Sequence, residues 1–321
     1  MYKRQVSAGT DKSSFYTSVS YLNNEGITVN SNYERLTGRL KADYQVKDWL
    51  KVGANMAYTY FNANSLSEDG SSASSGNVFA ISTRIAPIYP MYIRDGEGNI
   101  MIDKNGYKMY DYGDGENGGL GRPFMSGSNA YSATMLNENN AEGNAINAMG
   151  FAELRFLKDF KFTWTSSVNV DETRSTAFTN PYYGQYASQN GMLYKYHTRN
   201  LAYNHQQLLN WKRSFGSHNL DVMLGHESYR YKYYYLYASK SNMFDPTNHE
   251  LAGAITENGN NSYTTDYNTE GYFGRVQYDY NEKYFLSGSY RRDASSRFHP
   301  DHRWGNFWSA GAAWILSLIH I

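Results

Sequence analysis

Cysteine is absent from this chain of 321 residues, and proline occurs only 6 times. The lack of cysteine excludes disulfide bonds, thiol catalysis and thiolate metal sites. No apolar run approaches the roughly 18 residues that a membrane-spanning helix needs. The 30 basic residues are balanced by 30 acidic ones, so the chain lacks the basic field that nucleic-acid binding requires, and we expect no nucleic-acid partner.

Both ends of the chain match the two strands of one transposon mosaic-end adaptor of sequencing libraries. Residues 1–5 read MYKRQ, which the adaptor encodes when GTG is taken as a start, and residues 316–321 read LSLIHI, which its reverse complement encodes. We therefore expect both stretches to be adaptor scars and residues 6–315 to be an internal fragment. The opening residues also lack the apolar segment of a secretory signal.

Apolar and polar residues alternate along the stretch RLTGRLKADYQVKDWLKVGANMAYTYF, residues 35–61. A period of two predicts β-strands, because successive side chains of a strand point to opposite faces. The alternation breaks step only at Lys47 and Asp48, which predicts a hairpin with a tight turn. Each strand reaches the roughly 10 residues that a tilted strand needs to cross a bilayer.

One face of this hairpin is apolar and the other is charged. The apolar face has small aliphatic residues in mid-strand and aromatic residues near the ends, which is typical of a lipid-facing barrel wall. We expect the following residues to face lipid: Leu36, Leu40, Tyr44, Val52, Met56, Val276, Tyr278 and Tyr280. We expect the following residues to face the lumen: Arg39, Lys41, Asp43, Lys51, Arg275, Gln277 and Asp279.

Further alternating stretches lie at residues 13–23, 146–157, 160–172, 199–213, 218–237, 270–280, 283–293 and 306–315. Short connections are predicted at 47–48, 158–159, 214–217 and 281–282, and long ones at 62–145, 173–198, 238–269 and 294–305. Short turns on one side and long loops on the other are typical of an outer-membrane barrel. The sequence therefore predicts an all-β fold, a segment of an antiparallel transmembrane β-barrel with about ten strands, periplasmic turns and extracellular loops. No useful helical period appears.

Tyrosine is frequent, with 32 in the chain. The segment YRYKYYYLYASK, residues 229–240, turns from alternation to nearly continuous tyrosine, and we interpret it as an interfacial aromatic belt. Tyrosines in the loops have no membrane role, and aromatic faces stack on sugars and peptides. Candidates for substrate contact are Tyr89, Tyr92, Tyr107, Tyr110, Tyr112, Tyr182, Tyr183 and Tyr186. Ordinary loop packing is the alternative for the same residues.

No spacing of residues predicts catalysis, a metal site or a cofactor. The histidines lack an HExxH arrangement, the acidic stretch at 111–119 does not meet the EF-hand spacing, and no GxSxG is present. The Arg291-Arg292-Asp293 cluster could line a substrate path, but clustered charges more often form exposed ion pairs at strand ends. We expect a protein that is not an enzyme.

The stretch YFGRVQYDYNEKYFLSGSYRRDASSRFHPDHRWGNFWSAGAAW near the C-terminus resembles the barrel of SusC/RagA-type TonB-dependent outer-membrane transporters. Residues 9–58 and the stretch HNLDVMLGHE, residues 218–227, resemble the same family. The resemblance implies that residues 6–315 are part of such a barrel, without plug domain or TonB box, in the bacterial outer membrane. It implies import of large nutrients, oligosaccharides or peptides, with the TonB complex and a SusD-type surface lipoprotein as partners.

A rival interpretation is a soluble or cell-surface β-sandwich that binds glycans. A sandwich buries its apolar face against a second sheet and tolerates Phe and Ile throughout the strands, whereas a barrel wall places aromatics at the strand ends. The sequence shows the second pattern and favours the barrel.

Overall fold

The computed structural model describes residues 2–66, 78–119, 121–184 and 186–316. Eleven strands form one sheet, in which each strand lies beside its neighbours in the chain. The strands are β1 (Tyr2–Thr10), β2 (Ser13–Glu25), β3 (Asn32–Lys47), β4 (Leu50–Asn64), β5 (Glu138–Phe156), β6 (Phe160–Thr179), β7 (Met192–Phe215), β8 (His218–Met243), β9 (Ala254–Tyr280), β10 (Tyr284–Ser295) and β11 (Trp304–Trp314). The predicted all-β antiparallel fold is confirmed, with β1 as a strand that the sequence did not predict.

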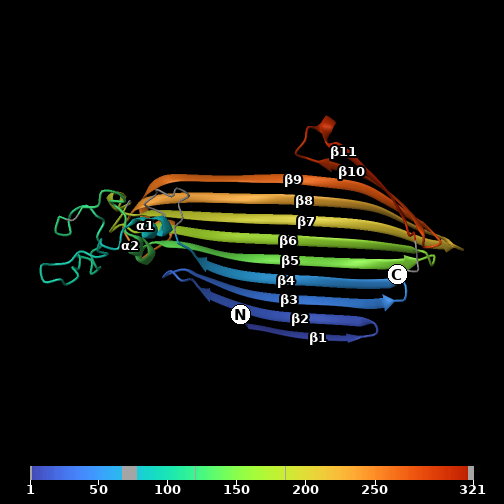
Figure 1. Cartoon of the computed structure of the whole chain (residues 1–321), viewed down its shortest axis with the longest axis horizontal. Coiled ribbons are helices and arrows are strands. Elements are labelled where there is room, and N and C mark those ends of the chain that lie inside the picture. Colours follow the sequence, from blue (N-terminus) through green and yellow to red (C-terminus); the bar gives the residue numbers. More distant parts are fainter. Residues whose placement is uncertain (1, 67–77, 120, 185, 317–321) are drawn as a thin grey trace.

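The tight turns lie at one end of the sheet and the β4–β5 connection lies at the other, whereas the β10–β11 connection projects from the sheet between the two ends (Figure 1). The helices are α1 (Val78–Arg84), α2 (Ala130–Leu136) and the single-turn 3₁₀ helices η1 (Ala187–Gln189), η2 (Leu251–Gly253) and η3 (Pro300–His302). None of the helices in the described part of the chain is long and apolar enough to cross a membrane. Within the described residues the sheet is open, because β1 and β11 stand at its two edges.

The two stretches expected to be adaptor scars lie at the edges of the described chain. Residues 2–5 are part of β1, and Leu316 follows β11. Met1 and residues 317–321 lie outside the described residues, as do residues 67–77 of the predicted long loop.

Backbone conformation explains why several turns are so short. Leu157 and Lys158 have φ values of 49° and 61°, and Asn281 and Glu282 have φ values of 54° and 53°. Two successive residues with positive φ form the hairpin turn whose twist matches that of the flanking strands. The turn predicted at residues 47–48 lies one position later, at 48–49, because the β3–β4 register shifts between positions 45 and 47.

Two of the four predicted long loops, 173–198 and 238–269, are mostly strand, and the loop predicted at 294–305 loses two residues at each end to β10 and β11. The connections that remain are residues 180–191, 244–253 and 296–303, and the loop predicted at 62–145 is confirmed as the longest connection, with narrower bounds of 65–137. The prediction was wrong because alternation of hydropathy exists only where one face of a strand is apolar. The first part of β9 reads AITENGNNSYTTDYNT and is polar on both faces, so period two leaves no hydropathy signal there.

The pairing register assigns every strand side chain to one of two faces. Leu40 lies opposite Met56, and Tyr44 lies opposite Val52, and directly opposed residues of antiparallel strands share a face. Followed from β3 to β9, the register places all eight predicted lipid-facing residues on one face and all seven predicted lumen-facing residues on the other. We name the face with Leu40 the outer face and the face with Lys41 the inner face.

Aromatic side chains gather on the outer face near the tight turns. The ring of Tyr284 lies 6.4 Å from Tyr280 and 5.8 Å from Trp314, measured between centroids. The outer face of β10 and β11 then continues with Leu286, Gly288, Ala310 and Ala312 up to the Tyr290–Trp308 pair. Small residues between two aromatic rows are the pattern of a lipid-facing wall.

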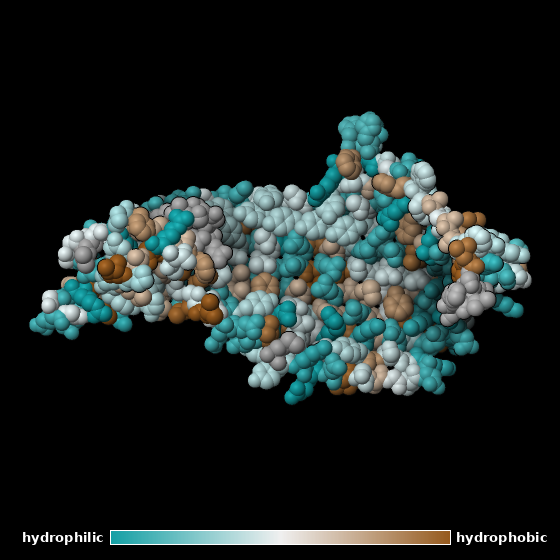
Figure 2. All heavy atoms as spheres, in the orientation of Figure 1, coloured by the Kyte–Doolittle hydropathy of each residue, from teal (hydrophilic) through white to brown (hydrophobic). Residues whose placement is uncertain are grey.

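Polar and apolar side chains are mixed on the face of the sheet that is turned to the viewer in Figure 2. All eleven strands lie in one sheet, whereas a β-sandwich needs two sheets that cover each other. The architecture therefore disfavours the rival interpretation.

Three glycines of the inner face lie under the ring of the phenylalanine directly opposite. The pairs are Gly53–Phe151, Gly143–Phe61 and Gly225–Phe273. A Cβ added at Gly225 would lie 2.2 Å from the Phe273 ring, so the ring would have to leave its position. We expect Gly225→Ala to lower the free energy of unfolding by about 1 to 3 kcal/mol. Gly38→Ala is the matched control, because a Cβ there meets nothing within 4 Å. Equal thermal midpoints for the two variants in detergent would contradict this.

Candidate functional site

The connection between β4 and β5 folds back on itself at the end of the sheet opposite the tight turns. We name its residues 78–119 and 121–137 the rim segment (Figure 1). Its two small hairpins are closed by the bridges Arg94↔Ile100 and Ile102↔Lys108, and their turns contain an Asp-Gly and an Asn-Gly dipeptide. In each, an aspartate oxygen accepts hydrogen bonds from backbone N–H groups, Asp95 from Asn99 at 2.8 Å and Asp103 from Tyr107 at 2.9 Å.

A buried polar core holds the rim segment together. Asn129 caps α2, because its Oδ1 accepts hydrogen bonds from the backbone N–H groups of Tyr131 and Ser132. Its amide nitrogen donates to the carbonyls of Met91 and Asp111 at 3.0 Å and 2.9 Å. Helices α1 and α2 were not predicted, because seven residues are too few to show a helical period.

Six of the eight tyrosines proposed for substrate contact form an aromatic cluster of two sets of rings, which adjoin at the consecutive residues Tyr182 and Tyr183. The centroid distances are 5.4 Å for Tyr92–Tyr110, 4.8 Å for Tyr107–Tyr182, 5.4 Å for Tyr110–Tyr183 and 6.0 Å for Tyr112–Tyr183. Tyr131, which the sequence analysis missed, joins them 5.9 Å from Tyr92. The cluster links the rim segment to the β6–β7 connection, so these rings pack two loops against each other.

The remaining two candidates lie near the edges of these loops. Tyr89 is half-buried, and its N–H donates to the carbonyl of Ala86 at 3.1 Å. The carbonyl of Tyr186 accepts hydrogen bonds from the N–H groups of Gln189 and Gly191 around η1. The structure does not bring either side chain into the ring contacts of the aromatic cluster described above.

The hydroxyl of Tyr183 donates a hydrogen bond to Asp103 at 2.8 Å across this loop interface. Burial opposes ionisation of Asp103, but the bonds from Tyr183 and from two backbone N–H groups outweigh it and lower the pKa of the carboxyl. Burial and the Asp103 carboxylate raise the pKa of Tyr183. The contact therefore joins a neutral phenol to an ionised carboxylate at neutral pH.

Exposure divides the cluster into two groups. Tyr110 is only 7% exposed, and burial raises its pKa, so its ring is covered by protein. Burial, followed by the neighbouring Tyr131, raises the pKa of Tyr92 to about 12. Tyr107 is 37% exposed and, with the half-buried Tyr182 beside it, keeps a surface that a ligand can reach.

A cavity of about 1040 Å³ lies beside the rim segment; we name it the rim cavity. Its wall includes α2, the β2–β3 connection and the ends of β6 and β7, with Tyr194 and Tyr196 among the lining residues. The His249 ring stacks on Phe178 at 4.0 Å and its Nδ1 lies 2.5 Å from Glu138. The wall therefore combines aromatic faces with hydrogen-bonding groups, which is what a specific ligand pocket needs.

Most tyrosines of the segment interpreted as an aromatic belt, residues 229–240, point to the inner face and not to the outer face. In the register, Tyr229, Tyr231, Tyr233, Tyr235 and Tyr237 share the inner face with Asp221 and Gln277. The outer positions of this segment hold Arg230, Lys232, Tyr234 and Leu236. The belt interpretation is therefore wrong for all of these tyrosines but Tyr234, because a lipid interface would contact the outer face. The sequence did contain a signal for the inner face, because these tyrosines occupy odd-numbered positions of β8, as Asp221 does.

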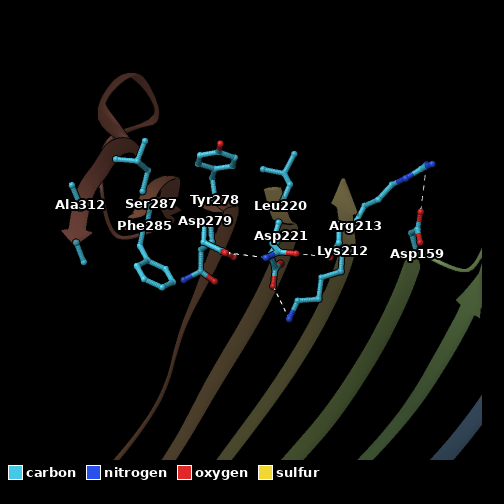
Figure 3. Close-up of a pocket in the computed structure, with 16 residues that line it drawn as sticks. Asp159, Lys212, Arg213, Leu220, Asp221, Tyr278, Asp279, Phe285, Ser287 and Ala312 are labelled. Carbon is cyan, nitrogen blue, oxygen red and sulfur yellow. Dashed lines mark hydrogen bonds and ion pairs between the residues drawn. The ribbon is translucent and has the colours of Figure 1, made fainter. Parts of the chain in front are cut away.

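A second cavity, of about 830 Å³, lies at the tight-turn end of β7 to β11. Figure 3 shows Leu220 and Tyr278 on one side of the strands and Asp221 and Phe285 on the other. Lys212 pairs with Asp221 at 2.9 Å, and the amide of Asn219 donates to Asp279 at 2.9 Å. Lys212 and Arg213 are paired with Asp221 and Asp159, whereas Asp279 accepts from a neutral amide and keeps its negative charge.

Two residues of the Arg291-Arg292-Asp293 cluster, Arg291 and Asp293, form ion pairs on the inner face, whereas Arg292 lies on the outer face over the Trp304 ring. Arg291 contacts Asp293 at 2.7 Å and Glu227 at 3.3 Å. Its guanidinium also lies 4.9 Å from the centroid of the Phe273 ring. A Cβ added at Gly271 would come within 2.4 Å of Asp293, so glycine makes room for this network. A third cavity, of about 610 Å³, lies beside it.

The described residues contain no group of three or more His, Asp or Glu side chains placed to hold a metal ion. No family model matches the chain. The sheet itself has the fold of the barrel wall of TonB-dependent transporters. A solved structure of the RagAB peptide importer in its closed-closed state matches it with a TM-score of 0.78 at 24% identity, over 97% of this chain and 33% of that chain.

Named relatives give the same class. TonB-dependent receptor P3 of Formosa agariphila is 25% identical over 97% of this chain and 30% of its own length. TonB-dependent receptor SusC of Bacteroides thetaiotaomicron is 26% identical over 96% of this chain and 30% of its own length. These comparisons confirm the resemblance to SusC/RagA-type TonB-dependent receptors, and the chain spans about 30% of the length of these relatives. The relatives are named as receptors, which agrees with the expectation of a protein that is not an enzyme.

Proposed function

We propose that this chain is part of a bacterial outer-membrane transporter that imports large nutrients, oligosaccharides or peptides, with energy from the TonB complex. The observation that carries the proposal is the division of one sheet of long strands into an outer face with aromatic rows and an inner face with charges. Such a wall separates lipid from a polar lumen. Contact with TonB would be made through parts of the transporter outside this chain.

The two faces of the sheet then have separate roles. Leu36, Leu40, Tyr44, Val52, Met56, Val276, Tyr278 and Tyr280 contact lipid in this proposal. Arg39, Lys41, Asp43, Lys51, Arg275, Gln277 and Asp279 line the lumen. The tight turns face the periplasm and have too few side chains to form a pocket, so substrate contact falls to the rim segment, its neighbouring loops and the inner face.

A SusD-type surface lipoprotein is the proposed partner at the rim. Support comes from the relative named SusC and from the likeness to the RagAB importer. The rim segment is compact and held by a buried polar core, so it can present a fixed surface to a lid. Tyr107 and Tyr182 would contact substrate or lid there.

The test is purification of the tagged complete transporter from outer membranes of its native host. We expect a SusD-type lipoprotein, encoded beside the transporter gene, to co-purify in near-equal amount. We also expect deletion of the transporter gene to abolish growth on one class of large nutrient. Recovery of the protein from the soluble fraction, with neither lipoprotein nor growth defect, would contradict the proposed function.

A further inference from the structure

The strands β7 to β9 extend beyond the aromatic rows of the outer face, and their inner face there is dominated by tyrosine. Every second residue of β8 from position 229 to position 237 is a tyrosine. Two further tyrosines of the same face, Tyr194 and Tyr196, lie on β7, and two more, Tyr263 and Tyr267, lie on β9. We name these nine side chains the tyrosine track.

The rings of the tyrosine track contact one another across the strands. Tyr237 lies 5.1 Å from Tyr196 on β7, in the group that also contains Tyr194. On β9, Tyr263 lies 4.9 Å from Tyr235, and Tyr267 lies 5.2 Å from Tyr231. Three groups of rings therefore follow one another along β8, which gives an extended aromatic surface and not an isolated pair.

Charged residues are rare beside the tyrosine track but frequent at the outer positions of the same strands. The residues directly opposite the five β8 tyrosines are Asn204, Ala202, Asn200, Thr198 and Tyr196 on β7 and Thr269, Tyr267, Thr265, Tyr263 and Asn261 on β9. None of them is charged. The outer positions of the same stretch hold Arg199, Arg230, Lys232 and Asp266. Only the guanidinium of Arg297, among the cation–ring contacts of the described residues, meets the track, 4.1 Å from the Tyr267 centroid.

The tyrosine track connects two cavities. Tyr194 and Tyr196 line the rim cavity of about 1040 Å³. Tyr229, at the other end of the track, lines the cavity of about 610 Å³ beside Glu227 and Arg291. A chain molecule that enters at the rim would therefore meet tyrosine rings continuously on its way toward the ion-pair network of the inner face.

We propose that the tyrosine track binds an uncharged oligosaccharide lying along β8. This inference rests on the proposed function and names the substrate class for it. Sugar rings have apolar C–H faces that pack on aromatic rings, and their hydroxyls pair with phenol, amide and hydroxyl groups such as those of Tyr233, Asn200 and Thr265. A peptide or an acidic glycan carries several charged groups along its length, and these would lose solvent here with Arg297 as the one cation that contacts the track among the described residues.

The test uses the tagged complete transporter in detergent and three probe mixtures. The probes are neutral oligosaccharides from hydrolysed plant polysaccharides, uronic-acid oligosaccharides and a tryptic peptide digest of casein. Mass spectrometry identifies what each protein sample retains, and isothermal titration with the retained species gives the Kd. Tyr233→Ala with Tyr235→Ala removes two rings of the track. Tyr234→Ala with Leu236→Ala is the matched control, because these side chains interleave with the track on the outer face.

We expect retention of neutral oligosaccharides, with a Kd raised about thirtyfold by the double inner variant and unchanged by the outer control. Tyr233→Phe with Tyr235→Phe keeps the rings and should raise the Kd by less than about fivefold. Preferential retention of peptides or acidic glycans, retention of no probe, or equal losses in both alanine variants would overturn the proposal. If peptides are retained and a SusD-type lipoprotein co-purifies, transport stands and the tyrosine track is not a sugar site.

Discussion

Leu40→Arg should deplete the complete transporter from the outer membrane, whereas Lys41→Leu should leave its level nearly unchanged. Leu40 is 42% exposed on the outer face and lies opposite Met56. It stands between two aromatic residues of the same face: Tyr44 on its own strand, and Tyr58 on β4, which lies opposite Gly38 of β3. An arginine in the middle of a lipid-facing wall costs about 2 to 4 kcal/mol, which is a large share of the 5 to 15 kcal/mol or so that keeps a typical protein folded.

Lys41 is the matched control because it is the next residue on the same strand and points to the inner face. Its opposite residue is Asn55, so a leucine there meets a polar wall and water instead of lipid. The measurement is the folded fraction in isolated outer membranes, read from gel mobility of heated and unheated samples, with thermal midpoints in detergent. Equal tolerance of the two variants would show that the assignment of the faces is wrong.

Much of the wall could be predicted from the sequence, because burial in lipid and exposure to a lumen impose a period of two. Parity alone predicted that Leu36, Met56 and Val276 share a face, and the register confirms this through six strand pairings. The prediction ended where the outer face stops being apolar. In the first part of β9, residues 254–269, both faces are polar, so the sequence analysis predicted a loop there.

The period-two alternation also predicts the face of the tyrosine track, although the aromatic-belt interpretation did not use it. Tyr229 to Tyr237 continue the parity of Asp221 and Glu227 without a break, so the alternation predicts the inner face. The aromatic-belt interpretation rested on composition, and composition does not distinguish one face of a strand from the other. Parity is the stronger argument wherever pairing is unbroken, since a one-residue slip would exchange the two faces. The β8–β9 register shifts only at Ser239 and Lys240, beyond the track.

The contacts that hold the rim segment together could not be predicted from the sequence. Its stability depends on contacts between distant positions, such as the bond from Tyr183 to Asp103 across 80 residues of sequence. The carbonyl groups that Asn129 binds come from positions 91 and 111. No local pattern specifies such partners. The loop tyrosines were therefore correctly grouped as loop residues, while their contacts with each other could be found only in the structure.

Replacing residues 88–118 by a short Gly-Ser linker should abolish growth on the nutrient that the complete transporter imports. The replacement removes both small hairpins and the rings of Tyr92, Tyr107, Tyr110 and Tyr112. The sheet should remain intact, because β4 and β5 pair independently up to the Asn64↔Asn140 contact. Loss of the rim surface and of the lid that we propose to rest on it would then stop uptake without loss of the barrel.

A finer pair of variants separates contact from folding within the rim segment. Tyr107→Ala with Tyr182→Ala removes the two accessible rings, and each should weaken binding by roughly 1 kcal/mol if it stacks on the ligand. Ile102→Ala is the control, because Ile102 lies on the same hairpin as Tyr107 and is 56% exposed. Growth rate, lipoprotein co-purification and outer-membrane level are measured for each variant.

Undiminished growth and lid binding after the replacement of 88–118, with the protein still in the outer membrane, would remove this loop from the transport mechanism and leave the inner face as the place of substrate contact.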